Sequence, residues 1–325
     1  MPRIPATLIA TLTLLLIALP LAVAAELQPI EFNADELVEQ AVIGEISQPA
    51  MRQSIYRVKA DGSVAMRPGT GSITYNYRTG DSAVNMAGNH VEPAVSLYNL
   101  GSESSRTGND NRALNALSMI GNRVRIVSGE ATGETGWVIG KHGGVEHLMV
   151  DFAPDVYDHL VIGDRMQIRA LGGGMRLTNV DDVRVFNASP DLIDALNANG
   201  AGITADGRLR VPVTHTIPAK IMGSGLGRDH VYTGDYDIQM FDEDVNERYN
   251  LDSLRFGDIV AIIDADHSHG RTWLGGAISV GVVVHGKSMT AGHGPGVTSL
   301  FASPSGNIDL VIDPEANLKS LLAIP

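Results

Sequence analysis

The stretch RFGDIVAIIDADHSHGRTWLGGAISVGVVVHGKSMTAGHGPG, from Arg255 to Gly296, decides the fold. It contains two runs, 259–263 and 278–284, in which β-branched and other aliphatic residues predominate. Such runs are typical of central strands that are buried on both faces of a sheet. Each run ends in carboxylate or imidazole side chains, so we expect these strands to present a polar site at the edge of a sheet.

The polar residues after the two runs form a predicted metal site. Imidazole and carboxylate ligands without any thiol select a divalent ion of borderline hardness. We therefore predict a zinc or manganese ion, with calcium as the alternative, held by Asp266, His267, His285 and His293. A set of rim residues whose polar atoms are satisfied by hydrogen bonds explains the pattern equally well.

Two carboxylates upstream complete the predicted site. Asp235 and Asp237 in GDYDI lie on one side of a short strand, and we predict them as the catalytic residues, one of them a general base. Whether these predicted ligands lie together depends on the relative direction of the two strands. If the two runs pair as antiparallel neighbours, His285 leaves the opposite edge from Asp266. The predicted site then reduces to His285, His293 and Asp235.

A second group of the same chemistry lies near the N-terminus. It consists of His90 and Glu92 in GNHVEP. Alternation along an extended chain places both side chains on one face. The sequence leaves open whether this group joins the C-terminal site.

The segment GVVVHGKS, residues 281–288, matches the P-loop pattern G-x-x-x-x-G-K-S letter for letter. A P-loop needs its variable positions in a loop and a helix after the lysine, so that backbone amides surround phosphate. Here the variable positions belong to the end of a strand, and the following MTAGHGPG does not favour a helix. We therefore do not expect this segment to bind a nucleotide.

The composition favours a mainly β fold with few short helices. Of the 325 residues, 36 are glycine and only 5% are aromatic, and glycine turns join short alternating runs. We predict an N-terminal β domain containing a small SH3-like or OB-like barrel, and a C-terminal β domain that carries the site. The expected parts are a signal peptide at 1–24, an N-terminal β region at 25–110, the barrel at 111–190, a helix and linker at 191–210, and the C-terminal domain at 211–325.

Three short patterns predict local structure. The N-x-x-E capping box at 33–36 predicts a helix that continues to Ile43. S-P-D at 189–191 predicts a second helix that ends at Gly200. D-G at 61–62, between two alternating runs, predicts a β-hairpin.

Residues 1–24 have the form of an export signal. Arg3 precedes an apolar run at 8–19, and Ala22 to Ala24 form an A-x-A cleavage site. We expect a periplasmic or secreted protein with no integral membrane segment after cleavage, because no later run is long enough to span a bilayer. The absence of cysteine suits an exported protein that avoids stray oxidation.

The charge balance bears on partners. With 24 basic and 37 acidic residues, the formal net charge is -13. An acidic surface repels phosphate backbones, which argues against nucleic acid as a partner. We expect a small-molecule ligand, and homo-oligomerisation stays open.

Short motifs spread over the chain carry a family resemblance. They are GTGSITYN (69–76), GDSA (80–83), NHVEP (89–93), GDYDI (234–238), LRFGDIVAI (254–262), VVVHG (282–286) and GHGPGV (292–297). Together they resemble the family catalogued as domain of unknown function 4438, which implies a β-rich two-part fold and no assigned activity. A weaker likeness, in GDYDI, LRFGD and the loop HGKSMTAGHGPG, is to the acetamidase and formamidase family.

Two functions are consistent with these observations. The first is a metal-dependent hydrolase of a small amide or related C–N bond, in which the ion activates water. The alternative is a non-catalytic protein that binds a small ligand or calcium, or that has a structural role. A tightly held transition metal would separate the first from the second.

Overall fold

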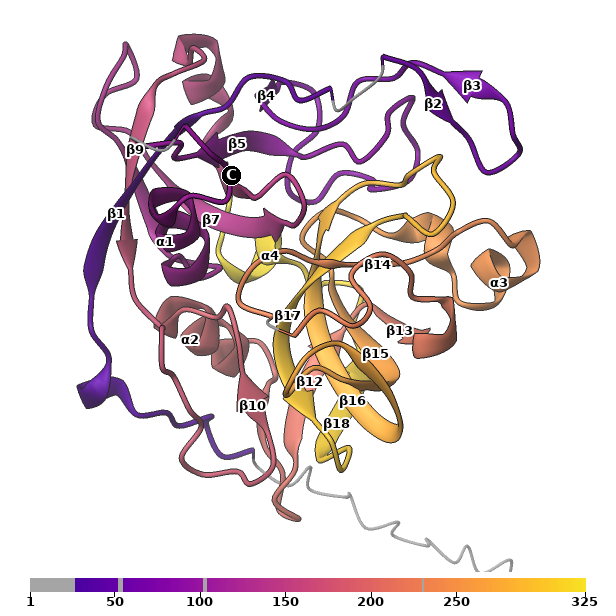
Figure 1. Ribbon diagram of the computed structural model, residues 1–325. Helices are drawn as coiled ribbons and strands as arrows, with labels where there is room; N and C mark the ends of the chain where they lie inside the picture. The colour runs from indigo at the N-terminus through magenta and orange to yellow at the C-terminus, as the bar shows by residue number, and fades with distance from the viewer. Residues whose placement is uncertain (1–26, 52–54, 102–103, 230) are drawn as a thin grey trace, which may run out of the picture.

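The structure is a computed structural model that describes residues 27–51, 55–101, 104–229 and 231–325 (Figure 1). The predicted signal segment, residues 1–24, lies outside the described residues. The described residues form eighteen strands and four α-helices. This confirms a mainly β fold with few short helices. None of the described helices has the length and apolar character needed to cross a membrane.

A closed six-stranded barrel forms the N-terminal half. Each strand pairs with its neighbours in antiparallel fashion, and the last pairs with the first. In order around the barrel the strands are β1 (Gln40–Ile46), β9 (Arg165–Ala170), β6 (Arg123–Ile126), β7 (Thr135–His142), β8 (His147–Asp151) and β5 (Ala94–Tyr98). The predicted barrel is therefore present, but β1 and β5 come from outside the expected segment 111–190.

The predicted N-terminal helix is wrong. Only Ala34–Glu36 is helical, as the single 3-10 turn η1, and β1 begins at Gln40. The side chains of the capping box do meet, since Asn33 Nδ2 donates to Glu36 Oε2 at 3.3 Å. The six consecutive pairs that β1 forms with β9 outweigh this local signal.

The second sheet contains the two aliphatic runs as central strands. Its order is β10 (Arg184–Val185), β17 (Gly296–Ser303), β16 (Thr272–His285), β15 (Ile259–Asp266) and β13 (His215–Pro218), with β14 (Tyr236–Asp237) also paired to β17. Side chains from alternate positions of β15 and β16 pack into two different core clusters. Both strands are thus buried on both faces, as the sequence predicts.

The remaining elements are a third sheet, a small hairpin, one further strand beside the barrel and four α-helices. A third sheet has the order β11 (Gly202–Ile203), β12 (Leu209–Val213) and β18 (Ile308–Ile312). The predicted hairpin at 61–62 joins β2 (Arg57–Val58) to β3 (Val64–Ala65), and β4 (Ile73–Thr74) lies beside β5. The α-helices are α1 (Asn109–Leu117), α2 (Pro190–Ala198), α3 (Glu243–Arg248) and α4 (Leu318–Leu321). The Ser189 side chain accepts a hydrogen bond from the Leu192 amide, so the predicted cap of α2 is confirmed.

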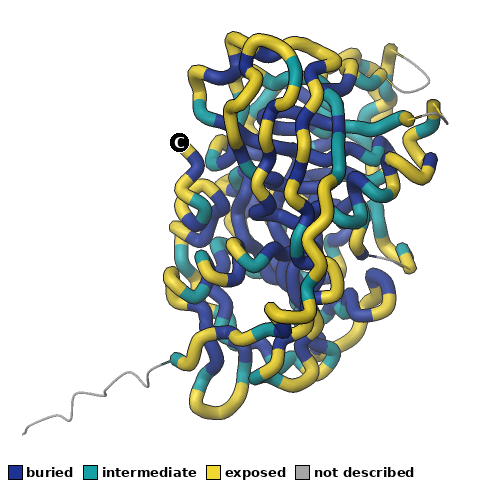
Figure 2. Tube along the Cα trace, turned by 90° about the vertical axis from the view of Figure 1, so that its left-hand side faces the viewer, coloured by how far each residue is buried: buried dark blue, intermediate teal, exposed yellow. Residues whose placement is uncertain are grey.

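The barrel and the second sheet share one hydrophobic core, which appears as a buried centre in Figure 2. Strand β7 of the barrel packs directly on β16. Gly140 makes this approach close, because a Cβ atom there would lie 2.4 Å from Val284 Cγ1. The contact brings the end of β7, at His142, next to the end of β16, at His285.

Candidate functional site

Two neighbouring groups of side chains could each hold a metal ion. The inner group consists of His142, Asp235 and His285, and the outer group consists of His90, Asp237 and His293. In each group, one ligand atom from every residue lies within 4.8 Å of the others. All three inner residues are buried, whereas His90 and His293 in the outer group are partly exposed.

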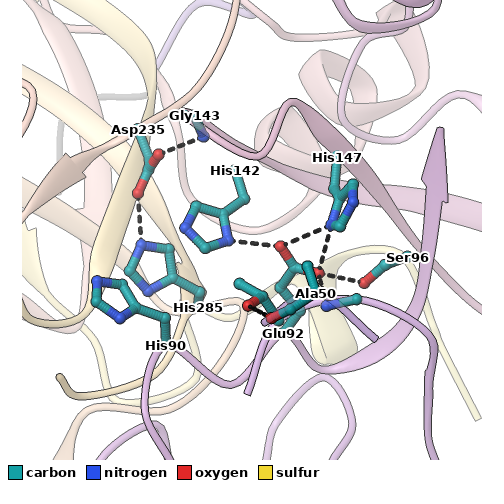
Figure 3. Close-up of polar contacts among 12 residues, drawn as sticks. Ala50, His90, Glu92, Ser96, His142, Gly143, His147, Asp235 and His285 are labelled. Atoms are coloured by element: carbon teal, nitrogen blue, oxygen red, sulfur yellow. Dashed lines mark hydrogen bonds and ion pairs between the residues drawn. The ribbon is translucent and has the colours of Figure 1, made fainter. Parts of the chain in front are cut away.

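The inner group is assembled from the ends of strands (Figure 3). The rings of His142 and His285 stack with their centroids 4.1 Å apart. His285 Nε2 lies 2.5 Å from Asp235 Oδ2, and the Gly143 amide donates to Asp235 Oδ1 at 2.7 Å. Gly296 leaves room for this pair, because a Cβ atom there would lie 2.1 Å from Asp235 Oδ2.

Glu92 contacts His142 on the ring edge opposite to its Nε2 and fixes the orientation of that ring. Its carboxylate is buried and lies 2.5 Å from His142 Nδ1 and 2.9 Å from His147 Nδ1. It also accepts hydrogen bonds from the Ser96 hydroxyl and the Gly71 amide. A carboxylate on Nδ1 of a histidine fixes the tautomer whose Nε2 can bind a metal. Glu92 thus has the position of a supporting carboxylate behind a group that could hold a metal ion.

Neighbouring groups of opposite charge stabilise the ionised forms of Glu92 and His285. Burial by itself raises the pKa of Glu92, but His147 and His142 outweigh it and hold that pKa well below its ordinary value. Burial by itself lowers the pKa of His285, but the Asp235 and Asp237 carboxylates hold it well above its ordinary value. Without a metal, the inner group is therefore an ion pair between His285 and the neighbouring carboxylates.

The outer group combines two histidines from loops with Asp237 at the end of β14. His90 Nε2 lies 3.0 Å from His293 Nδ1, which lies 3.2 Å from Asp237 Oδ2. The Gly294 amide donates to the same carboxylate oxygen at 3.1 Å. Burial, followed by repulsion from the neighbouring histidines, lowers the pKa of His90 to about 2, so its ring is neutral and able to bind a metal.

Asp237 connects the two groups. Its Oδ1 lies 3.7 Å from His285 Nε2 of the inner group, while its Oδ2 faces His293 of the outer group. Burial by itself raises the pKa of Asp237, but hydrogen bonds and charge from these two histidines lower it overall. The carboxylate is therefore ionised, as a metal ligand must be.

The loop that holds His90 reaches the site through backbone contacts. The His90 amide donates to the Lys287 carbonyl, and the Gly286 amide donates to the Val91 carbonyl. The Asn89 side chain accepts hydrogen bonds from the Ser288 hydroxyl and the Met289 amide. Residues 89–91 thus lie against the chain that follows β16, which places the N-terminal pair beside the C-terminal histidines.

The structure assembles only part of the predicted metal set. His285 and His293 lie at the site, and so do Asp235 and Asp237, which now belong to the ligand groups. Asp266 and His267 belong to neither group. The reduced prediction of His285, His293 and Asp235 also falls at the site, divided between the inner and outer groups.

The direction of strand pairing explains why the predicted set is divided. Strands β15 and β16 are antiparallel, and Asp266 pairs with Thr272 at the end of β16 opposite to His285. The Asp266 side chain accepts a hydrogen bond from the Ser268 amide. His267 Nδ1 lies 2.6 Å from the Ser299 hydroxyl. The structure therefore does not bring Asp266 and His267 together with His285 and His293, so these four residues do not form one group.

Two histidines of the site were missed. His142 and His147 lie on β7 and β8 of the barrel, far from the C-terminal motifs in sequence. The signal that could have found them is the pattern KHGG at 141–144, a histidine at the end of a strand before a glycine turn. The structure answers the open question about His90 and Glu92, which do join the C-terminal residues.

A pocket opens onto both groups. It has a volume of about 370 Å³, within the range of small-molecule sites. Its walls include His90, His142, Asp235, Asp237 and His293. Two arginines, Arg57 and Arg228, line the same pocket.

The fold and site define a mainly β protein in which a closed barrel and a second sheet meet at a histidine and aspartate centre. The chain belongs to the DUF4438 family. The model of its N-terminal domain of unknown function matches residues 56–194, and that of its C-terminal domain matches residues 200–322.

A solved structure, titled "Crystal structure of TM1086", is similar to this chain throughout. It has 41% sequence identity and a TM-score of 0.82, and the match covers 90% of this chain and 98% of that one. The search of curated proteins gave no match. The similarity supports the fold and the family and names no activity.

Proposed function

We propose that the protein is a metal-dependent hydrolase of a small amide or related C–N bond. The observation that carries this proposal is the pair of adjacent groups, each with two imidazoles and one carboxylate, that face one pocket. The buried Glu92 behind His142 is the supporting contact that metal-binding histidines usually have. The donor sets therefore fit divalent transition metals.

The donor chemistry favours zinc, manganese or iron over calcium. Calcium takes six to eight oxygen ligands, whereas each group here offers two ring nitrogens and one carboxylate. A divalent ion in such a site supplies a Lewis acid and lowers the pKa of water to near neutrality. This is the chemistry that hydrolysis of an unreactive amide requires.

We assign different roles to the two aspartates. Both Asp235 oxygens are engaged within the inner group, by Gly143 and His285, which suits a ligand. Asp237 contacts histidines of both groups and lines the pocket. It is the carboxylate placed to accept a proton from a reacting water, in addition to its role as ligand.

The proposal is tested by metal content and by hydrolysis. The purified protein should bind two equivalents of zinc or manganese, and His142→Ala should remove one of them. Small amides incubated with the loaded protein should release ammonia or amine. His159→Ala is the matched control, because His159 pairs with Glu130 on the exposed surface and should bind metal as the wild type does. A protein that holds only calcium, or no ion, would support the non-catalytic alternative.

We also propose that the protein acts in the periplasm or outside the cell. The apolar run at 8–19 and the site ending at Ala24 support this location. N-terminal sequencing of the protein from the cell envelope should begin at or near Ala25. A chain that still begins at Met1 in the cytosol would contradict export.

A further inference from the structure

The pocket over the two groups contains cations as well as ligands. Arg57, from β2, and Arg228, from the segment before β14, both line it. The chain has a formal net charge of -13, so a small pocket with two guanidinium groups has the opposite sign to the chain as a whole. Arginine is the side chain that recognises carboxylate and phosphate through two parallel hydrogen bonds.

Neither of these two arginines has a close anionic partner among the described residues. Five others form ion pairs with nitrogen to oxygen distances of 2.5 to 3.0 Å: Arg78, Arg169, Arg176, Arg210 and Arg255. Arg57 is half-buried and has no carboxylate within ion-pair distance among the described residues. Arg228 has only a loose contact of 3.6 Å with Glu146. Their donors are therefore available to a ligand.

The metal groups strengthen this positive field. Two divalent ions would balance the four nearby carboxylates Glu92, Asp235, Asp237 and Glu146, so the two guanidinium groups would leave the pocket with a net positive charge. A small pocket of one sign with low-dielectric walls concentrates ligands of the opposite sign. A neutral amide would leave both guanidinium groups unpaired.

We propose that the substrate carries a carboxylate in addition to its scissile amide, and that Arg57 and Arg228 bind that carboxylate. This inference rests on the proposed hydrolase function. It narrows the substrate class from small amides in general to acidic amides, such as acylated amino acids or half-amides of dicarboxylic acids.

Two hydroxamates test the inference without catalysis. Acetohydroxamate and the monohydroxamate of succinic acid bind metal through the same group, but only the second carries a carboxylate. Calorimetric titration of the zinc-loaded protein should show about tenfold or greater preference for the succinyl compound, as expected for a charge-assisted bidentate contact. Arg57→Gln and Arg228→Gln should each reduce this preference, because each should weaken binding of the succinyl compound more than binding of acetohydroxamate. Arg169→Gln, which alters an exposed ion pair, should keep the preference.

The outcomes separate the two proposals. If zinc does not bind, the proposed function and this inference both fail. If zinc binds and the two hydroxamates bind equally well, only this inference fails. A preference that survives both pocket substitutions would show that the arginines do not bind the carboxylate. Because the wild-type comparison uses no variant, poor folding of one variant cannot obscure the result.

Discussion

The inner and outer groups have the same donors but different surroundings. The inner residues lie at the ends of packed strands, are buried, and are supported by Glu92 behind His142. The two outer histidines lie on loops, and the side chain of His293 is 38% exposed, whereas Asp237 is buried at the end of β14. Ligands held by rigid elements need little reorganisation to bind a metal. We therefore expect the inner group to bind more tightly and the outer group to exchange its ion more readily.

The largest expected effect comes from breaking the inner ion pair. In the metal-free protein, His285→Ala leaves Asp235 buried without its partner, and breaking such a pair costs about 3 to 5 kcal/mol. Urea unfolding of the metal-free protein measures this loss. If His293→Ala is equally destabilising, the inner group contributes no more to the free energy of unfolding than the outer group does.

Removing the charge of Glu92 should weaken metal binding at the inner group. Loss of a supporting carboxylate typically lowers metal affinity by about 10- to 100-fold. Competition with a chelator should show this effect for Glu92→Gln, with little change at the outer group. Glu130→Gln is the control, because Glu130 is exposed and pairs with His159. Equal weakening at both groups would mean that Glu92 acts through the fold as a whole.

The pH dependence of stability can test whether His267 is a metal ligand, as the sequence predicted. Burial, followed by the Arg271 guanidinium, lowers its pKa to about 3. Between that value and the ordinary pKa of about 6.5, the unfolded chain binds a proton that the folded chain does not. Stability is therefore lost as the pH falls through this window.

His267→Gln should remove that part of the acid sensitivity. The loss of unfolding free energy between pH 7 and pH 5 should shrink by about 2 kcal/mol, measured by urea unfolding. The same reduction is expected with and without zinc if His267 is not a ligand. A reduction that disappears when zinc is present would place His267 at the metal after all.

The smallest expected effect is at the outer group. His293→Ala should remove one equivalent of bound metal but change stability by no more than about 0.5 kcal/mol, because the side chain is partly exposed and lies on a loop. Metal analysis and urea unfolding of the same preparation measure both quantities. A large loss of stability here would erase the distinction between the two groups.

The sequence predicts the strands better than it predicts the site. Aliphatic runs without alternation identify β15 and β16 as central strands, because burial on both faces requires that composition. The helix at 33–43 fails because a capping box is a weak local signal and barrel closure requires an extended chain there. Local sequence patterns therefore predict a helix or strand correctly where the burial pattern and the intrinsic propensity indicate the same element.

The site depends on contacts that local patterns do not contain. Asp266 is separated from His285 by the antiparallel direction of one strand pair, which the sequence leaves open. His142 joins His285 only because β7 of the barrel packs on β16, although the two strands lie far apart in the sequence. Residue chemistry thus predicted a cluster of histidines and carboxylates, while long-range packing determined which residues belong to it.

Gly140 offers a way to change the distance between His142 and His285 without replacing either histidine. It sits two residues before His142 and against Val284, which precedes His285, so the size of these two side chains sets how closely the two imidazoles approach. Ions that differ in radius and preferred geometry need different spacings between their ligands. A larger residue at position 140 would push the two strands apart, and a smaller residue at position 284 would let them approach. Both changes lie in the hydrophobic core, and both would alter the spacing of the imidazoles. If the proposed metal site is correct, relatives that keep all six residues are expected to differ in metal preference when positions 140 and 284 differ.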